Sequence, residues 1–139
     1  MTNSLAPEHK ADPGPCHTSA LTDLHGSGGL CSSLSDLLLY LSANIGLTKT
    51  PLSRAMGMQL TRTRQTMYRA TQVGLEWHIT DLQDKKIVWH NGLTAGHYSF
   101  IGFDPMRRAG VVILADTANA MNEIGLNLLS GVAGISAIL

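Results

Sequence analysis

Residues 89–116, WHNGLTAGHYSFIGFDPMRRAGVVILAD, contain two apolar runs that alternate as strands do. The runs are 97–103 (HYSFIGF) and 110–116 (GVVILAD). The segment between them, DPMRRA, opens with Asp104-Pro105, a pair that initiates turns. The stretch therefore predicts two neighbouring strands joined by a short hairpin connection.

Two more strand-like runs precede this stretch, at 73–80 (VGLEWHIT) and 85–90 (KKIVWH), and the polar loop DLQDK separates them. Strands that follow one another with links this short pair antiparallel. The sequence therefore predicts an antiparallel meander of about four strands. Within it, we interpret His78, next to Trp77, as a partly buried structural histidine.

The Asn91-Gly92 pair can be read in two ways. Asn-Gly between apolar runs is the strongest short-range signal for a hairpin turn. Gly96 is also a good turn residue, so the hairpin can instead close at 94–96 and leave His90 to Gly92 extended on a strand. Spacing alone does not decide between these alternatives.

A strong helix is predicted upstream of the strands. Ser33 is a good N-cap, Asp36 follows three residues later as in a capping box, and Gly46 offers a C-terminal stop. Apolar residues recur between them at helical spacing, namely Leu34, Leu37, Leu38, Leu41 and Ile45.

Two further helices are predicted. The first begins with Thr50 as cap and Pro51 in the first turn and runs to about Leu60. The second follows the strands and is expected to cover one sheet face with a single apolar stripe, made of Met121, Ile124, Leu128 and Val132.

The order of these elements is helix, helix, four strands, helix, which is an α+β arrangement in which helices flank the meander. Residues 1–27 are rich in Pro and Gly and show neither period, so we expect an extended, partly disordered lead-in. Residues 28–139 then form one domain, as the length of 139 residues allows.

The net charge is zero, so no global field attracts nucleic acid or an anionic membrane. The charges are nevertheless unevenly placed, because five cations and no acid lie between Asp36 and Glu76. The cations are Lys49, Arg54, Arg62, Arg64 and Arg69. We interpret them first as a solvated basic face or a contact with an acidic neighbour. An anionic substrate is a weaker alternative, and nucleic acid is weaker still.

Cys16 and Cys31, with His17 and His25 nearby, match no standard zinc-ligand spacing, so we expect no metal and no cofactor. The first twenty residues lack the apolar core of a secretory signal, and no apolar run is long enough to span a membrane. On these grounds we expect the chain as given to be soluble and cytoplasmic.

From Gly28 to about Leu129 the chain resembles the C-terminal half of the serine β-lactamase family. The resemblance is strongest to class C β-lactamases, D-Ala-D-Ala carboxypeptidases and β-lactamase-fold esterases. Three blocks carry it in order: GGLCSSLSDLLLYL, similar to the family's Gly-Gly-Leu-x-Ser-Thr-x-x-Asp-Leu helix start; GLEWHI, similar to its Gly-Leu-Gly-Trp strand; and residues 89–116. The implied fold is a partial β-lactamase/transpeptidase-like domain.

The resemblance also implies a substrate-cleft wall on a strand that runs through Gly92, with the turn at about Thr94 to Gly96. His90-Asn91-Gly92 falls on the family's Lys-Thr-Gly box, which reads His-x-Gly in many esterase and peptidase-like members. There the first residue lines the cleft, and the glycine lets substrate approach the backbone. The backbone N–H of Leu93 matches a family oxyanion-hole donor. The chain departs from the pattern at Leu93, where a small residue is usual, and at Ala95, where Gly is common.

The family's nucleophile is the Ser of a Ser-x-x-Lys motif, and a Tyr-x-Asn (or Ser-x-Asn) motif supplies its general base or an equivalent. This sequence contains no Ser-x-x-Lys and no Tyr-x-Asn, so it holds no complete catalytic set. Acyl transfer requires an activated nucleophile within hydrogen-bonding reach of its base. The chain alone is therefore expected to be inactive.

Two hypotheses follow. The chain is the C-terminal segment of a serine hydrolase that acts on a small acyl substrate (a β-lactam, an ester or a D-Ala peptide), and the parent protein could then be periplasmic. Alternatively, it is a non-catalytic binding or assembly module. Either way, the expected partner is a second copy of the chain or a separate N-terminal half, and neither nucleic acid nor membrane.

Overall fold

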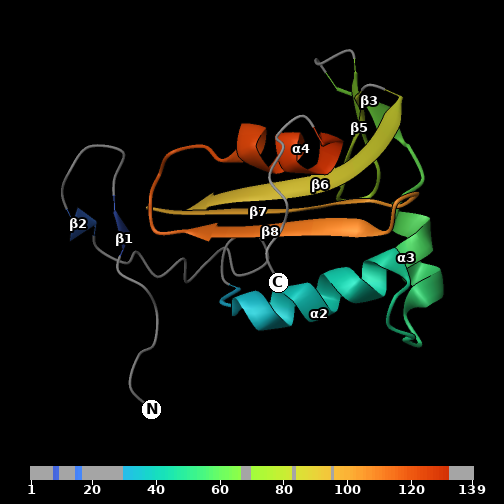
Figure 1. The fold of residues 1–139 in the computed structure, drawn as a ribbon, viewed down its shortest axis with the longest axis horizontal. Coiled ribbons are helices and arrows are strands. Elements are labelled where there is room, and N and C mark those ends of the chain that lie inside the picture. The colour runs from blue at the N-terminus through green and yellow to red at the C-terminus, as the bar shows by residue number, and fades with distance from the viewer. Residues whose placement is uncertain are drawn as a thin grey trace.

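The computed structural model describes residues 8–9, 15–16, 30–66, 70–82, 84–94 and 96–131. A six-stranded antiparallel sheet forms its centre, with helix α4 on one face and helix α2 on the other (Figure 1). Two short strands near the N-terminus, β1 (Glu8–His9) and β2 (Pro15–Cys16), pair with each other. The rest of the predicted lead-in, residues 1–27, lies outside the described residues.

The sheet is a meander in which sequence order and spatial order coincide. Its strands are β3 (Arg64–Gln65), β4 (Thr71–Val73), β5 (His78–Leu82), β6 (Lys85–Thr94), β7 (His97–Asp104) and β8 (Ala109–Ala115). The α+β meander is thus confirmed, but with six strands rather than about four. The predicted run at 73–80 is in fact divided, because the chain turns where the Gly74 N–H donates to the Trp77 carbonyl at 2.8 Å.

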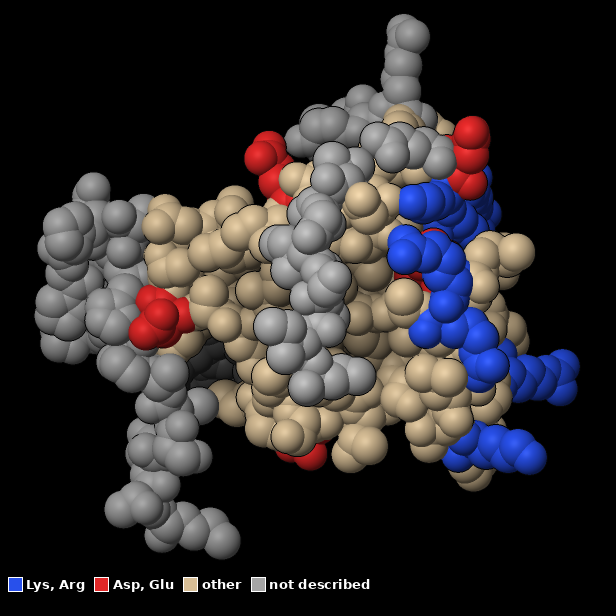
Figure 2. Space-filling model, viewed as in Figure 1, with Lys and Arg blue, Asp and Glu red and all other residues tan. Residues whose placement is uncertain are grey.

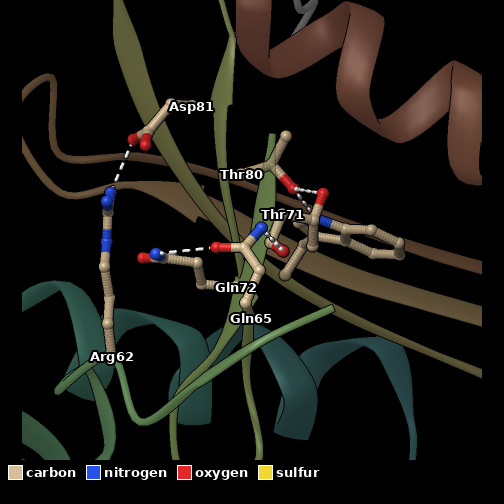
Figure 3. A network of polar contacts seen from close by, with 7 residues as sticks. Arg62, Gln65, Thr71, Gln72, Thr80 and Asp81 are labelled. Atoms are coloured by element: carbon tan, nitrogen blue, oxygen red, sulfur yellow. Dashed lines mark hydrogen bonds and ion pairs between the residues drawn. The ribbon is translucent and has the colours of Figure 1, made fainter. Parts of the chain in front are cut away.

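The two unpredicted strands, β3 and β4, are short and polar, and side-chain hydrogen bonds hold them (Figure 3). Gln72 donates to Gln65 at 3.0 Å across the β3–β4 pair. Thr71 and Thr80 share a 2.9 Å hydrogen bond across the β4–β5 pair. Arg62 forms a 2.5 Å ion pair with Asp81. Since apolar alternation plays no part here, the sequence pattern gave no strand signal.

Side chains alternate between the two faces along each central strand. On β7, Phe103 belongs to the core under α2, whereas Phe100 belongs to the core under α4. The core under α2 consists of Leu41, Trp77, Ile79, Val88 and Phe103. The core under α4 consists of Ile87, Tyr98, Phe100 and Leu129. The sheet is therefore a central layer between two helices.

Helix α2 (Leu34–Ile45) begins and ends as predicted. The Ser33 hydroxyl accepts the Asp36 N–H at 3.2 Å, and Gly46 closes the helix in the left-handed conformation, with φ of 77°. Helix α3 (Ser53–Gln59) starts later than predicted, with Leu52 rather than Thr50 at the cap position. Thr50 instead accepts the Leu52 N–H at 3.3 Å in the turn that precedes the helix.

Helix α4 (Asn122–Ser130) covers one sheet face as predicted, but with a different stripe. The buried positions are Gly125, Leu129 and Ser130, while Ile124 is half exposed. A Cβ at Gly125 would lie 2.3 Å from the Phe100 ring, so the glycine allows the helix to approach the sheet. The buried positions Gly125 and Leu129 therefore each lie one residue after the predicted Ile124 and Leu128. Val132, the last residue of the predicted stripe, lies outside the described residues.

Lys and Arg side chains gather at one end of the molecule (Figure 2, right). Three of them donate to carbonyls at helix C-termini, where the helix dipole is negative. Arg107 reaches Leu129 O at 3.0 Å, Lys85 contacts Ser130 O, and Arg108 reaches Gly46 O at 2.8 Å. Part of the basic character therefore has a structural role. No helix in the described part of the chain is long and apolar enough to cross a membrane.

Candidate functional site

The His90–Thr94 part of β6 has one open edge. Strand β5 pairs with β6 only as far as the His78–Trp89 pair. Beyond Trp89, β6 continues for five residues and pairs with β7 alone among the described strands. Along the edge that faces away from β7, no described strand pairs with the backbone of this segment.

The structure decides between the two readings of Asn91-Gly92. Strand β6 runs through Gly92 to Thr94, and Thr94 pairs with His97. Gly96 has a φ of 126°, which an L-residue rarely adopts. The chain therefore reverses after Thr94, and His90-Asn91-Gly92 is extended on the strand, as the second alternative predicted.

His90 is exposed and lies over His78, with the ring centroids 5.5 Å apart and the planes 12° from parallel. His78 also contacts Trp89, at 4.7 Å between centroids. Burial lowers the pKa of His78 below its ordinary value of 6.5, and the neighbouring charge of His90 lowers this pKa further. The buried Nδ1 of His78 finds no hydrogen-bond partner among the described residues. His78 is thus partly buried, as predicted, and it favours the neutral form.

Asn91 points to the opposite face of the sheet. Its Nδ2 donates to the Tyr98 hydroxyl at 2.8 Å, and that hydroxyl donates to Asn122 Oδ1 at 2.6 Å. Asn122 is the first residue of α4. Asn91 therefore links strand β6 to helix α4 through Tyr98.

Gly92 faces Ser99 on the neighbouring strand. A Cβ at position 92 would lie 2.9 Å from Ser99 Oγ, so a larger residue requires that hydroxyl to move. Leu93 follows, with 56% of its side chain exposed. Successive residues of a strand alternate in direction, so His90 and Gly92 share one face while Asn91 and Leu93 share the other. The bulky Leu93 side chain therefore does not lie over Gly92.

Two contacts could not be predicted from the sequence, the His78–His90 stack and the Asn91–Tyr98–Asn122 chain. Both join residues on different elements, so they depend on how those elements pack. Ser42-Ala43-Asn44 has the spacing of the alternative Ser-x-Asn motif and was not predicted as a candidate. Those two side chains bond locally, Ser42 with Thr48 Oγ1 at 2.7 Å and Asn44 with Tyr40 O at 2.9 Å.

No metal site is visible in the described ranges, where no three His, Cys, Asp or Glu side chains are arranged to hold an ion. Cys31 is an exposed free thiol. His17 and His25 lie outside the described residues, and so does the side chain of Cys16.

The sequence model of the beta-lactamase family matches residues 2–129. No curated protein matches the chain. Solved structures that share its fold include the following two. One is the octameric penicillin-binding protein homologue from Pyrococcus abyssi, with 22% identity, 74% of this chain and 24% of that chain covered, and a TM-score of 0.66. The other is a class C beta-lactamase, with 17% identity, 94% of this chain and 44% of that chain covered, and a TM-score of 0.67.

The chain spans less than half the length of either structure. At these identities the likeness establishes the fold, while the family match extends over almost the whole chain. The α+β meander, the strand that carries His90-Asn91-Gly92 and the turn after Thr94 all agree with that match. The chain belongs to the beta-lactamase family.

Proposed function

We propose that this chain supplies one wall of the acyl-transfer cleft of a beta-lactamase-like serine hydrolase. The substrate would lie along the open edge of β6 between His90 and Leu93. The observation that carries the proposal is this edge, which is free of β5 from His90 onward. An extended amide or lactam can pair with such an edge by backbone hydrogen bonds.

Each residue of the segment has a distinct role in this proposal. The exposed imidazole of His90 would contact the polar end of the substrate, in its neutral or charged form. Gly92, which has no side chain, would let the substrate approach the backbone. The N–H of Leu93 would donate to the oxygen on which negative charge develops during acyl transfer.

The nucleophile would come from polypeptide outside these 139 residues, because the sequence holds neither Ser-x-x-Lys nor Tyr-x-Asn. A wall with one oxyanion donor binds and orients substrate but forms no acyl-enzyme. The supplier would be a separate N-terminal half. The octameric penicillin-binding protein homologue shows that a protein of this fold assembles, and we extend self-association to this chain.

Hydrolysis and intact mass measurements test the first part of the proposal. The purified chain is incubated with a chromogenic cephalosporin, a p-nitrophenyl ester and a fluorescent penicillin. We expect no hydrolysis above the rate in buffer and no increase in protein mass. A covalent adduct on any serine of this chain would overturn the proposal, and the modified serine would then be the nucleophile.

A non-catalytic binding module is the second candidate, and the absence of both catalytic motifs from this sequence favours it. The two candidates differ in what an N-terminal partner does. A polypeptide that carries Ser-x-x-Lys and Tyr-x-Asn, encoded next to this chain, should restore hydrolysis if the first candidate is right. It should leave hydrolysis at the buffer rate if the chain is only a binding module.

A further inference from the structure

The two-residue loop after Thr94 determines which backbone groups of β6 face its open edge. Thr94 pairs with His97 across the loop. In one kind of antiparallel pair the two residues exchange both N–H···O=C bonds, and in the other kind these bonds lie on either side of the pair. Thr94 and His97 form the first kind, because the second would require a hydrogen bond between the two adjacent residues of the loop. The N–H and C=O groups of Thr94 therefore point to β7.

The direction of these groups alternates along β6, because the two kinds of pair alternate along an antiparallel ladder. The register between β6 and β7 is unbroken along the whole segment. The backbone groups of Gly92 and His90 therefore bond to β7, as those of Thr94 do. The N–H and C=O groups of Asn91 and Leu93 point the other way, to the edge of β6 with which no described strand pairs.

One tyrosine lies next to both of these outward-facing residues. Tyr98 faces Leu93 in the register of β6 and β7. Its hydroxyl accepts a hydrogen bond from Asn91 Nδ2 at 2.8 Å and donates one to Asn122 Oδ1 at 2.6 Å. Asn122 is the first residue of α4. The hydroxyl of Tyr98 therefore connects the open edge of β6 to the helix that covers this face of the sheet.

The Tyr98 hydroxyl has a well-defined position. The residue is 3% exposed, and it packs with Phe100 and Leu129 in the core under α4. A phenol hydroxyl has one hydrogen to donate, and here Asn122 accepts that hydrogen while Asn91 donates to the oxygen. A buried hydroxyl that is bonded on both sides holds its partners in one arrangement. The side chain of Asn91 is therefore anchored although its backbone lies on an open edge.

We infer that Tyr98 is a positioning residue for the proposed cleft wall. Its hydroxyl holds the side chain of Asn91 toward α4 and so sets the direction in which the N–H groups of Asn91 and Leu93 meet a substrate. Tyr98 touches no substrate itself, because it is buried on the face of the sheet opposite to His90. The inference rests on the proposed function, since a donor stabilises developing charge only when it is aimed at the oxygen that carries the charge.

A penicillin titration followed by amide NMR tests the inference. Tyr98→Phe removes the hydroxyl and keeps the ring. The Kd of penicillin, measured from the shifts along β6, should rise about threefold to tenfold, which corresponds to the loss of one hydrogen-bonded link. The matched control is Thr71→Val, which removes a buried hydroxyl that shares a 2.9 Å hydrogen bond with Thr80. Because Thr71 lies on β4, which pairs with β3 and β5, this control should leave the Kd unchanged.

Substitutions of Asn122 separate positioning from stability. Asn122→Asp keeps an oxygen that accepts from Tyr98, so penicillin should bind as it does to the wild type. Asn122→Ala removes that oxygen, and the Kd should rise as in Tyr98→Phe. Urea unfolding of each variant gives the loss of stability, which Thr71→Val should share. The inference is overturned if Thr71→Val weakens penicillin binding as much as Tyr98→Phe does, or if Asn122→Ala binds penicillin as the wild type does.

Residual dipolar couplings test the positioning without a ligand, because they report the orientation of each N–H bond. In Tyr98→Phe the couplings of Asn91 and Leu93 should change, while those of Ile79 and Phe103, in the core under α2, should not. Unchanged couplings at Asn91 and Leu93, with penicillin still bound along β6, refute the positioning role alone. A wild-type chain whose β6 amides do not respond to penicillin refutes the proposed function, and the inference falls with it.

Discussion

The imidazole of His78 lies between two aromatic neighbours, Trp89 on the adjacent strand and His90 one residue further along. This contact links a partly buried residue to the exposed residue that we place in the cleft. The charge of His90 lowers the pKa of His78, because like charges that lie close together repel. The proposed cleft wall therefore has a neighbour, His78, whose pKa is lowered in the fold.

Acid should destabilise the fold through His78. Its pKa is lower in the folded chain than its ordinary value of 6.5, first by burial and then by His90. The unfolded chain consequently binds this proton at higher pH than the folded chain does. The contribution of neutral His78 to the stability of the fold is complete above pH 6.5 and is lost as the pH falls through the pKa of His78 in the folded chain. Urea unfolding measures the free energy of unfolding at about pH 7.5 and at about pH 5.5. The decrease in this free energy between the two pH values should be smaller in His78→Gln than in the wild type.

Replacing His90 separates the two causes that lower the pKa of His78, burial and the charge of His90. In His90→Gln the pKa of His78 should rise, because the charge of His90 is removed, but it should stay below 6.5, because burial remains. A titration of the His78 ring proton by NMR measures this directly. An unchanged or lowered pKa in His90→Gln would contradict the stacked arrangement.

At the scale of elements, local signals predicted α2 and the turn between β6 and β7 well. Ser33 and Gly46 are end signals that need no tertiary contact, and Gly96 marks a turn by its own conformational freedom. The α4 stripe was wrong because its closest contact is made by Gly125, which apolar periodicity does not count. Strands β3 and β4 were missed because polar side-chain bonds hold them, as between Gln65 and Gln72.

The role of Gly125 leads to a stability prediction. A methyl group there would overlap the Phe100 ring, whose atoms lie 2.3 to 2.5 Å from the added Cβ. Overpacking of this kind costs about 1–3 kcal/mol, against a gain of up to about 1 kcal/mol from replacing glycine in a helix. Gly125→Ala should therefore lower the free energy of unfolding in urea.

Gly57→Ala on α3 is the matched control, because nothing lies within 4 Å of a Cβ at that position. It should leave the free energy of unfolding unchanged or raise it by up to about 1 kcal/mol. An equal response to the two substitutions would show that α4 does not approach β7 as closely as described.

At the scale of the whole molecule, the His90–Thr94 segment and the basic end lie apart. The hairpins at 82–85 and 104–109 share one end of the meander, whereas the hairpin after Thr94 lies at the other. Three of the cations at the first end, Lys85, Arg107 and Arg108, contact helix C-termini. Of the five cations between Asp36 and Glu76, Arg62 forms an ion pair with Asp81.

The candidate site could be predicted only in part from the sequence. The motif located His90, Asn91 and Gly92 on one strand, and the strand pairing confirmed that position. The open edge could not be predicted, because it depends on where β5 ends relative to β6. The roles of His90 and Leu93 in substrate binding stay predictions.

An amide NMR titration with a penicillin tests the cleft wall most directly. At roughly millimolar ligand, the range for a weak complex, amide shifts should move along β6 from His90 to Thr94. The shifts should be reduced in His90→Ala and retained in Lys86→Ala, which alters the same face of the strand near its other end. Shifts confined to other elements, or shifts along β6 that His90→Ala leaves unchanged, would contradict the cleft wall.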